Sequence, residues 1–135
     1  MCELRAVFVV GAARTPIGNF LGALKDFRAP QLGGIAIRTA LERAGLKGED
    51  VDEVIMGQVV TAGVGQAPAK QAAVNGGVPY TVNSFAVNKV CGSGLKAVHL
   101  AAQSIWLEEK EIVVAGGMES MSQAPHLVCG ARSGV

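Results

Sequence analysis

The chain has few cysteines, 3 in 135 residues, and they lie far apart in the sequence. A small domain held together by disulfides has an even number of cysteines at close, regular spacings. The odd number and wide spacing argue against such a framework. We therefore expect a reducing compartment, the cytoplasm, in which the cysteines remain free thiols.

The sequence also lacks an excess of charge of either sign and any long apolar run. It has 12 Lys and Arg residues against 11 Asp and Glu residues, which are interspersed along the chain. No apolar run approaches the roughly 20 residues that a membrane-spanning helix needs. The first residues enter an apolar run without the layout of a signal peptide. We expect neither nucleic acid nor a membrane as a partner.

Aromatic residues (4%) and charged residues (17%) are scarce, whereas half of the chain is hydrophobic and 18 residues are glycine. Disordered segments are rich in charge and poor in apolar residues, so disorder does not fit this composition. The composition suits a buried α/β sheet, or a subunit that covers part of its surface with a partner. The length allows one domain with one core.

Apolar runs that alternate with helical patterns predict the order β-α-β-α-β-α-β. This order implies an α/β fold with a mainly parallel sheet and helices on its faces. The expected strands cover 6–10, 54–60, the first half of 82–98, and 111–115; the expected helices cover 30–44, 68–74 and the stretch after Cys91.

Local signals define parts of these elements. Pro30 suits the first turn of a helix and Gly45 suits its end. Gly57, inside the second strand, is a candidate bulge. In the third helix, apolar residues at helical spacing are expected to face the core: Leu95, Val98, Ala102 and Ile105.

Cys91 lies between a β-prone run and a helix start, and Gly92 and Gly94 follow it. Free N–H groups and the macrodipole at a helix N-terminus favour a negative charge, and the thiolate is the nucleophilic form of cysteine. We therefore interpret Cys91 as a nucleophile that accepts an acyl group. The alternative is a small buried hydrophobe at a tight turn.

Other motifs around Cys91 point less clearly to a function. The pattern Gly92-x-Gly94 resembles half of a dinucleotide fingerprint, but it follows the third strand and lacks the acidic residue expected about 20 positions later. Ser93 does not fit a hydrolase nucleophile, because position 91 is not glycine. Saturable thermal stabilisation by NAD would support the dinucleotide alternative.

Histidines and the remaining cysteines do not complete a site. His99 lies about two helical turns after Cys91, roughly 12 Å away along the axis and too far for a hydrogen bond. His126 and Cys129 lack the paired spacing of a zinc site, so we expect no metal. The residues alone thus supply one nucleophile without a clear base or acid, and an acyl transfer needs both.

Four stretches resemble the thiolase family. The run NKVCGSGLKAV at 88–98 resembles the family's nucleophile signature, and VAGGMESMS at 114–122 resembles its next hallmark. GAARTPIG at 11–18 and GQAPAKQAA at 65–73 are also similar to thiolase sequence. The similarity covers nearly the whole chain and is strongest to the subgroup that handles acetoacetyl-CoA.

The resemblance implies a mechanism with coenzyme A thioesters as substrates and no permanently bound cofactor. Cys91 would be acylated by an acyl-CoA, and a second, deprotonated acetyl-CoA would attack the acyl-enzyme in a Claisen condensation. The reverse reaction is thiolysis of a 3-ketoacyl-CoA. The backbone N–H of Cys91 would contribute to an oxyanion hole, and the kinetics would be ping-pong.

The resemblance also implies that the chain corresponds to an incomplete N-terminal part of a thiolase. Residues 1–117 would form the N-terminal α/β domain, and 118–135 would begin an inserted loop domain. The family's asparagine, histidine and second-cysteine motifs do not occur here, and neither Cys2 nor Cys129 has the glycine-rich context of the second cysteine. We expect no complete catalytic cycle from these 135 residues alone.

Thiolases assemble as dimers or tetramers, which implies partner contacts. By resemblance, 84–88 would lie at a homodimer interface and 66–71 near the partner's active site. Two other classes stay open. One is a ketosynthase-like condensing enzyme, although the hallmark at 118–121 favours a thiolase. The other is a non-catalytic interaction module.

Overall fold

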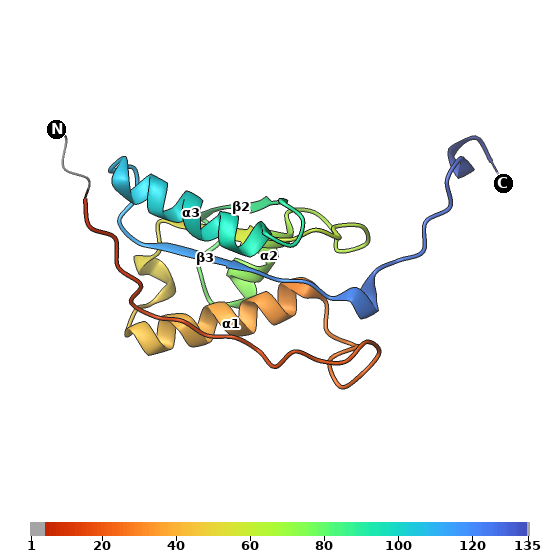
Figure 1. Cartoon of the computed structure of the whole chain (residues 1–135), viewed down its shortest axis with the longest axis horizontal. Coiled ribbons are helices and arrows are strands. Elements are labelled where there is room, and N and C mark those ends of the chain that lie inside the picture. Colours follow the sequence, from red (N-terminus) through yellow and green to blue (C-terminus); the bar gives the residue numbers. More distant parts are fainter. Residues whose placement is uncertain (1–4, 135) are drawn as a thin grey trace.

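The computed structural model describes residues 5–134 and shows three layers, with one small sheet between helices (Figure 1). The sheet has three parallel strands in the order β2-β1-β3: β1 is Glu53–Gly57, β2 is Asn83–Val87 and β3 is Val113–Gly117. The helices are α1 (Ala29–Ala44), α2 (Pro68–Asn75) and α3 (Ser93–Trp106). The expected α/β class and parallel sheet are confirmed.

The central strand β1 is buried on both faces, which explains its unbroken apolar sequence. Val54 and Met56 pack in one cluster with residues of α1 and α2. Ile55 points to the opposite face and packs against Ala97 and Ala101 of α3. Successive side chains of a strand alternate between its faces, so β1 joins both cores.

Helix α1 begins and ends close to where the sequence signals place it. Pro30 stands in its first turn, and Gly45 takes the left-handed conformation at its end, with φ of +67°. Glycine adopts this conformation without the steric cost of a Cβ atom. The prediction for this helix is confirmed, as is that for α2.

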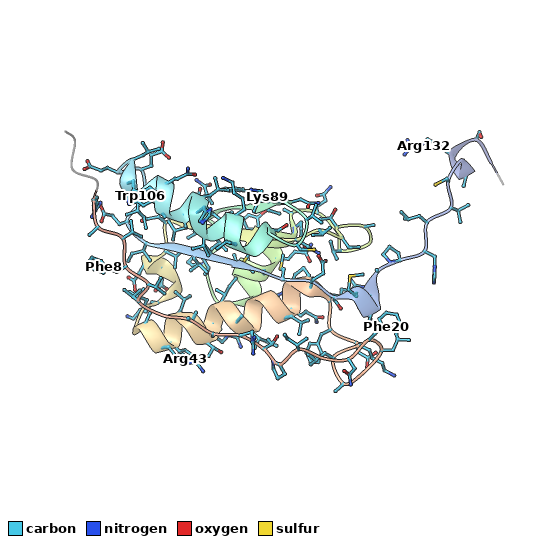
Figure 2. All side chains as sticks on the ribbon, viewed as in Figure 1. Phe8, Phe20, Arg43, Lys89, Trp106 and Arg132 are labelled. Atoms are coloured by element: carbon cyan, nitrogen blue, oxygen red, sulfur yellow. The ribbon has the colours of Figure 1, made fainter. Side chains whose placement is uncertain are left out.

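The expected strand over 6–10 is wrong: no strand precedes α1 in the part of the chain that the structure describes. This segment and the residues after it run beside α1 (Figure 1), and Nη1 of Arg43 donates to the carbonyl of the nearby Ala12 at 2.7 Å. An apolar cavity of about 360 Å³ lies between the segment, α1, α3 and β3. The cavity separates the segment from the edge of β3, so its backbone does not join the ladder. Phe8, which Figure 2 labels, and Val9 stay largely exposed.

Two further expectations need correction. The second strand ends at Gly57, so Val59 and Val60 lie outside it and Gly57 is its last residue, not a bulge. On α3, Leu95 and Val98 are exposed and Ala102 and Ile105 are half-buried beside the cavity. The buried face consists of smaller residues: Ser93, Ala97, Ala101 and Ser104. At its start, α3 lies so close to the sheet that Gly57 and Gly117 have no room for a Cβ atom.

After β3 the chain leaves the sheet through two short 3-10 turns, Met121–Gln123 and Ala131–Ser133, and its last part runs away from the body of the molecule (Figure 1). The division at residue 117 into two domains stays a prediction. Within residues 5–134, every helix is too short or too polar to cross a bilayer.

Candidate active site

The carboxyl ends of all three strands lie at the same end of the sheet, which we call its carboxyl end. Gly57 pairs in register with Val87 on one side and with Gly117 on the other. The loops that follow carry Gln58, Asn88 and Glu119 in the first two positions beyond the strands. Ligand sites of parallel α/β sheets form at this end.

The start of α3 is pressed against this carboxyl end. A Cβ atom added to Gly57 would lie 2.4 Å from the carbonyl carbon of Ser93 and 2.5 Å from the nitrogen of Gly94. A Cβ atom on Gly117 would lie 3.1 Å from Cα of Gly94. The glycines are therefore needed for the approach of backbone to backbone, and this contact fixes the position of the helix N-terminus.

Cys91 lies in the tight turn between β2 and α3, just ahead of the first residue of the helix. Its side chain is exposed, so in the described chain it is not the buried hydrophobe that was the alternative. Figure 2 shows the neighbouring Lys89 at this end of α3 and Trp106 at the other. The first N–H groups of a helix have no partner within it, and they create a positive potential beside the thiol.

The residue before Cys91 has a strained backbone. Val90 has a φ of +49°, and it is the one β-branched residue with positive φ among those described. For a β-branched side chain this conformation is a genuine outlier, with a cost of about 1–3 kcal/mol. Strain of this kind persists where surrounding contacts impose it, commonly at functional sites.

Glu119 joins the loops after β3 and β1. Its carboxylate accepts hydrogen bonds from the N–H of Val59 at 2.9 Å and of Val60 at 3.3 Å. Nδ2 of Asn88 donates to the carbonyl of Val59 at 3.4 Å. The loops after the three strands are thus tied to one another, and the loop after β2 leads directly to Cys91.

Gln58 is a polar residue of this carboxyl end that the sequence analysis missed. It is 2% exposed, and its Nε2 donates to the carbonyl of Val60 at 2.9 Å. Its Oε1 is buried without a hydrogen-bond partner among the described residues. A glutamine directly after a buried apolar strand was the signal that could have found it.

The histidines and Cys129 do not join Cys91. His99 is exposed on α3, and His126 and Cys129 lie in the exposed segment after Met121–Gln123. Among residues 5–134, no group of three or more His, Cys, Asp or Glu side chains could hold a metal ion. Cys2 lies outside the described residues.

The carboxylates with shifted pKa values lie at the amino end of the sheet, opposite the carboxyl end that Cys91 follows. Hydrogen bonds from the N–H groups of Ile112 and Glu111 lower the pKa of Asp52, and the hydrogen bond from Arg5 lowers the pKa of Glu111. These shifts arise from contacts that join the amino ends of β1 and β3. They mark structural ties and not an acid or base for Cys91.

Comparison with known proteins shows which family the chain belongs to. Residues 7–135 match the family model described as thiolase, N-terminal domain. Among curated proteins, acetyl-CoA acetyltransferase of Cupriavidus necator is 59% identical over 128 residues, which are 95% of this chain and 33% of that protein.

Two eukaryotic proteins are similar to the same extent. A cytosolic acetyl-CoA acetyltransferase of Gibberella zeae is 56% identical over 99% of this chain and 34% of its own length. Acetyl-CoA acetyltransferase 1 of Arabidopsis thaliana is 55% identical over 96% of this chain and 31% of its own length. The chain spans about a third of the length of these relatives. Because the thiolase model covers nearly all of it, the chain belongs to the thiolase family.

Proposed function

We propose that the protein containing this chain is an acetyl-CoA C-acetyltransferase that uses Cys91 as its nucleophile. The observation that carries the proposal is the exposed thiol at the N-terminal end of α3, within the residues that match the thiolase N-terminal domain. The names of the similar proteins support acetyl-CoA as the substrate. The family match speaks against the dinucleotide-binding alternative.

In the first half-reaction, the thiolate of Cys91 attacks the carbonyl carbon of an acyl-CoA thioester. The tetrahedral intermediate collapses, the bond to the sulfur of coenzyme A breaks, and coenzyme A leaves as a thiolate that then takes up a proton. The developing oxyanion is stabilised by N–H groups at the start of α3, including that of Cys91. Cys91 then carries the acyl group as a thioester.

In the second half-reaction, a second acetyl-CoA loses a proton from its methyl group, and the resulting carbanion attacks the acyl-enzyme. A carbon–carbon bond forms, the thiolate of Cys91 is released, and acetoacetyl-CoA results; thiolysis is the reverse. By resemblance, the family's asparagine, histidine and second-cysteine motifs, which do not occur in these 135 residues, would move these protons. We therefore expect no complete catalytic cycle from the 135 residues alone.

We further place the protein in the cytoplasm as a homodimer or homotetramer. The small, odd number of cysteines supports a reducing compartment. Strand β2 supports an interface, because it is at the edge of the described sheet and Asn83, Phe85 and Ala86 are exposed. An unpaired strand edge is a ready site for pairing with another chain.

The test uses the protein at its full natural length, incubated with acetyl-CoA and without a second substrate. We expect release of coenzyme A in an initial burst and an acetyl group on Cys91, located by peptide mass spectrometry. Cys91→Ala removes both signals, whereas the matched variant Cys129→Ala keeps them. A burst that survives Cys91→Ala, or acetylation elsewhere, contradicts the proposal and favours a non-catalytic role for this domain.

A further inference from the structure

The turn that presents Cys91 is held by side chains on both polar groups of Val90. Oδ1 of Asn88 accepts the N–H of Val90 at 2.9 Å. Oγ of Ser93 donates to the carbonyl of Val90 at 2.5 Å, and the backbone N–H of Ser93 donates to the same carbonyl at 3.1 Å. The left-handed conformation of Val90 is therefore secured from both sides.

Ser93 uses its hydroxyl twice. Besides donating to Val90, its oxygen accepts the N–H of Lys89 at 2.8 Å. A serine hydroxyl has one hydrogen and two lone pairs, so it can link a carbonyl to an N–H in this way. It thereby connects the two residues that precede Cys91.

The hydroxyl of Ser93 is also anchored to the rigid part of the fold. Ser93 is 4% exposed and is the first residue of α3. Its backbone lies against Gly57, where even a Cβ atom would not fit. A side chain on such a support holds its partners in a defined geometry.

We propose that Ser93 is a positioning residue for Cys91: its hydroxyl holds Val90 in the left-handed conformation and so sets where the thiol and N–H of Cys91 point. This proposal deepens the proposed function and rests on it. Ser93 takes no part in bond making. Without its hydroxyl, the carbonyl of Val90 keeps only the backbone N–H of Ser93 as a donor, so the hold on the left-handed conformation weakens and Cys91 is less firmly kept in the orientation that attack on a thioester requires.

The test measures acetylation of Cys91 by acetyl-CoA in the full-length protein. We expect Ser93→Ala to slow acetylation about 10- to 100-fold, as misplacement of a reacting group by about 1 Å can. Ser104→Ala is the matched control, because Ser104 is also buried on α3 and donates within the helix to the carbonyl of Ala101. An equal effect of the two substitutions overturns the proposal.

A double-mutant cycle with Val90→Gly separates positioning from general stability. Glycine adopts positive φ about as readily as negative φ, and the side chain of Val90 is 66% exposed and not part of a core. In the Val90→Gly background, we expect removal of the Ser93 hydroxyl to slow acetylation less than about 3-fold. The same loss in both backgrounds overturns the proposal, because a merely structural serine does not depend on the conformation of Val90.

Two measurements keep the result clear. If Ser93→Ala yields no folded protein, Asn88→Ala tests the same turn, because Asn88 is exposed and holds the N–H of Val90. Unchanged acetylation then overturns the proposal.

If the unmodified protein is not acetylated, the proposed function fails. The rate of Cys91 alkylation by iodoacetamide relative to Cys129 then reports on the turn: a changed ratio in Ser93→Ala supports its positioning role, and an unchanged ratio overturns it.

Discussion

The two ends of the sheet are held together by different means. At the amino ends of β1 and β3, Asp52 accepts hydrogen bonds from the N–H groups of Glu111 and Ile112 at 2.8 and 3.0 Å, and Arg5 forms an ion pair with Glu111. These groups are exposed to solvent. At the carboxyl ends, glycines allow backbone contact and a strained residue precedes the thiol.

The difference indicates where the molecule tolerates change. Exposed ion pairs contribute little stability, because water and salt screen them. Buried backbone contacts have no room to adjust, because protein interiors are close-packed. We therefore expect substitutions at the carboxyl end to have large effects and substitutions at the amino end to have small ones.

The largest effect is expected for Gly57→Ala. The added methyl group would meet the backbone of Ser93 at 2.4 Å, so β1 and α3 must separate. Overpacking of this kind costs about 3 kcal/mol in the free energy of unfolding. Urea denaturation measures it.

Gly116→Ala is the matched control, since it also places a methyl group on a strand. The added atom would lie 3.7 Å from Sδ of Met56, which is an ordinary contact. We expect a change below about 1 kcal/mol. Equal destabilisation by the two substitutions would show that the helix start is not held by its fit to Gly57.

An intermediate effect is expected for Glu119→Ala. This change leaves the N–H groups of Val59 and Val60 without their acceptor. The free energy of unfolding should fall by about 1–2 kcal/mol. Glu119→Gln keeps an acceptor oxygen and should lose about half as much, whereas equal losses in the two variants would mean that the hydrogen bonds contribute nothing. Thermal denaturation at neutral pH distinguishes these outcomes.

The smallest effect is expected for Asp52→Ala. Hydrogen bonds from Ile112 and Glu111 lower the pKa of this carboxyl group in the folded state. Its stabilisation is therefore present above the unfolded pKa of about 4, and it is lost as the pH falls through the lower folded value. Because Asp52 is exposed, we expect about 0.5 kcal/mol at pH 7.

The pH dependence of this variant sharpens the comparison of the two ends. The stability difference between Asp52→Ala and the unmodified protein should shrink below about pH 4. Asp52→Asn retains an acceptor without the charge, so it should keep much of the stability and lose the pH dependence. A difference that grows as the pH falls would contradict the sign of the pKa shift.

Local sequence patterns predicted much of the fold. Helix α1 follows from an apolar face between Pro30 and Gly45, and the position of Cys91 ahead of a helix follows from Gly92 and the residues after it. Such signals act within a few residues of the chain, so they can be read without knowledge of distant contacts. The thiolase resemblance, carried by four motifs, is confirmed by the family match.

The errors arose where distant contacts decide the outcome. The apolar pattern of 6–10 predicted a strand, but a strand needs a neighbour for its hydrogen bonds, and the cavity beside β3 separates this segment from the sheet. The larger apolar residues of α3 were expected inside. Ala97 and Ala101 are inside instead, packed against Ile55 of β1, because the path of the helix over the sheet turns this face inward and leaves Leu95 exposed.

The sequence by itself determined the helices, the parallel direction of the strands and the thiol at the start of α3, since propensity, capping and periodicity are properties of neighbouring residues. Only the tertiary structure decided which face of α3 is buried, why residue 57 is glycine, and how Ser93 and Asn88 hold Val90 in a strained conformation. The first two features depend on the distance between α3 and β1, which are far apart in the chain, whereas the contacts of Val90 are local but support a conformation that β-branched residues disfavour. That distance is set by packing and not by any local pattern.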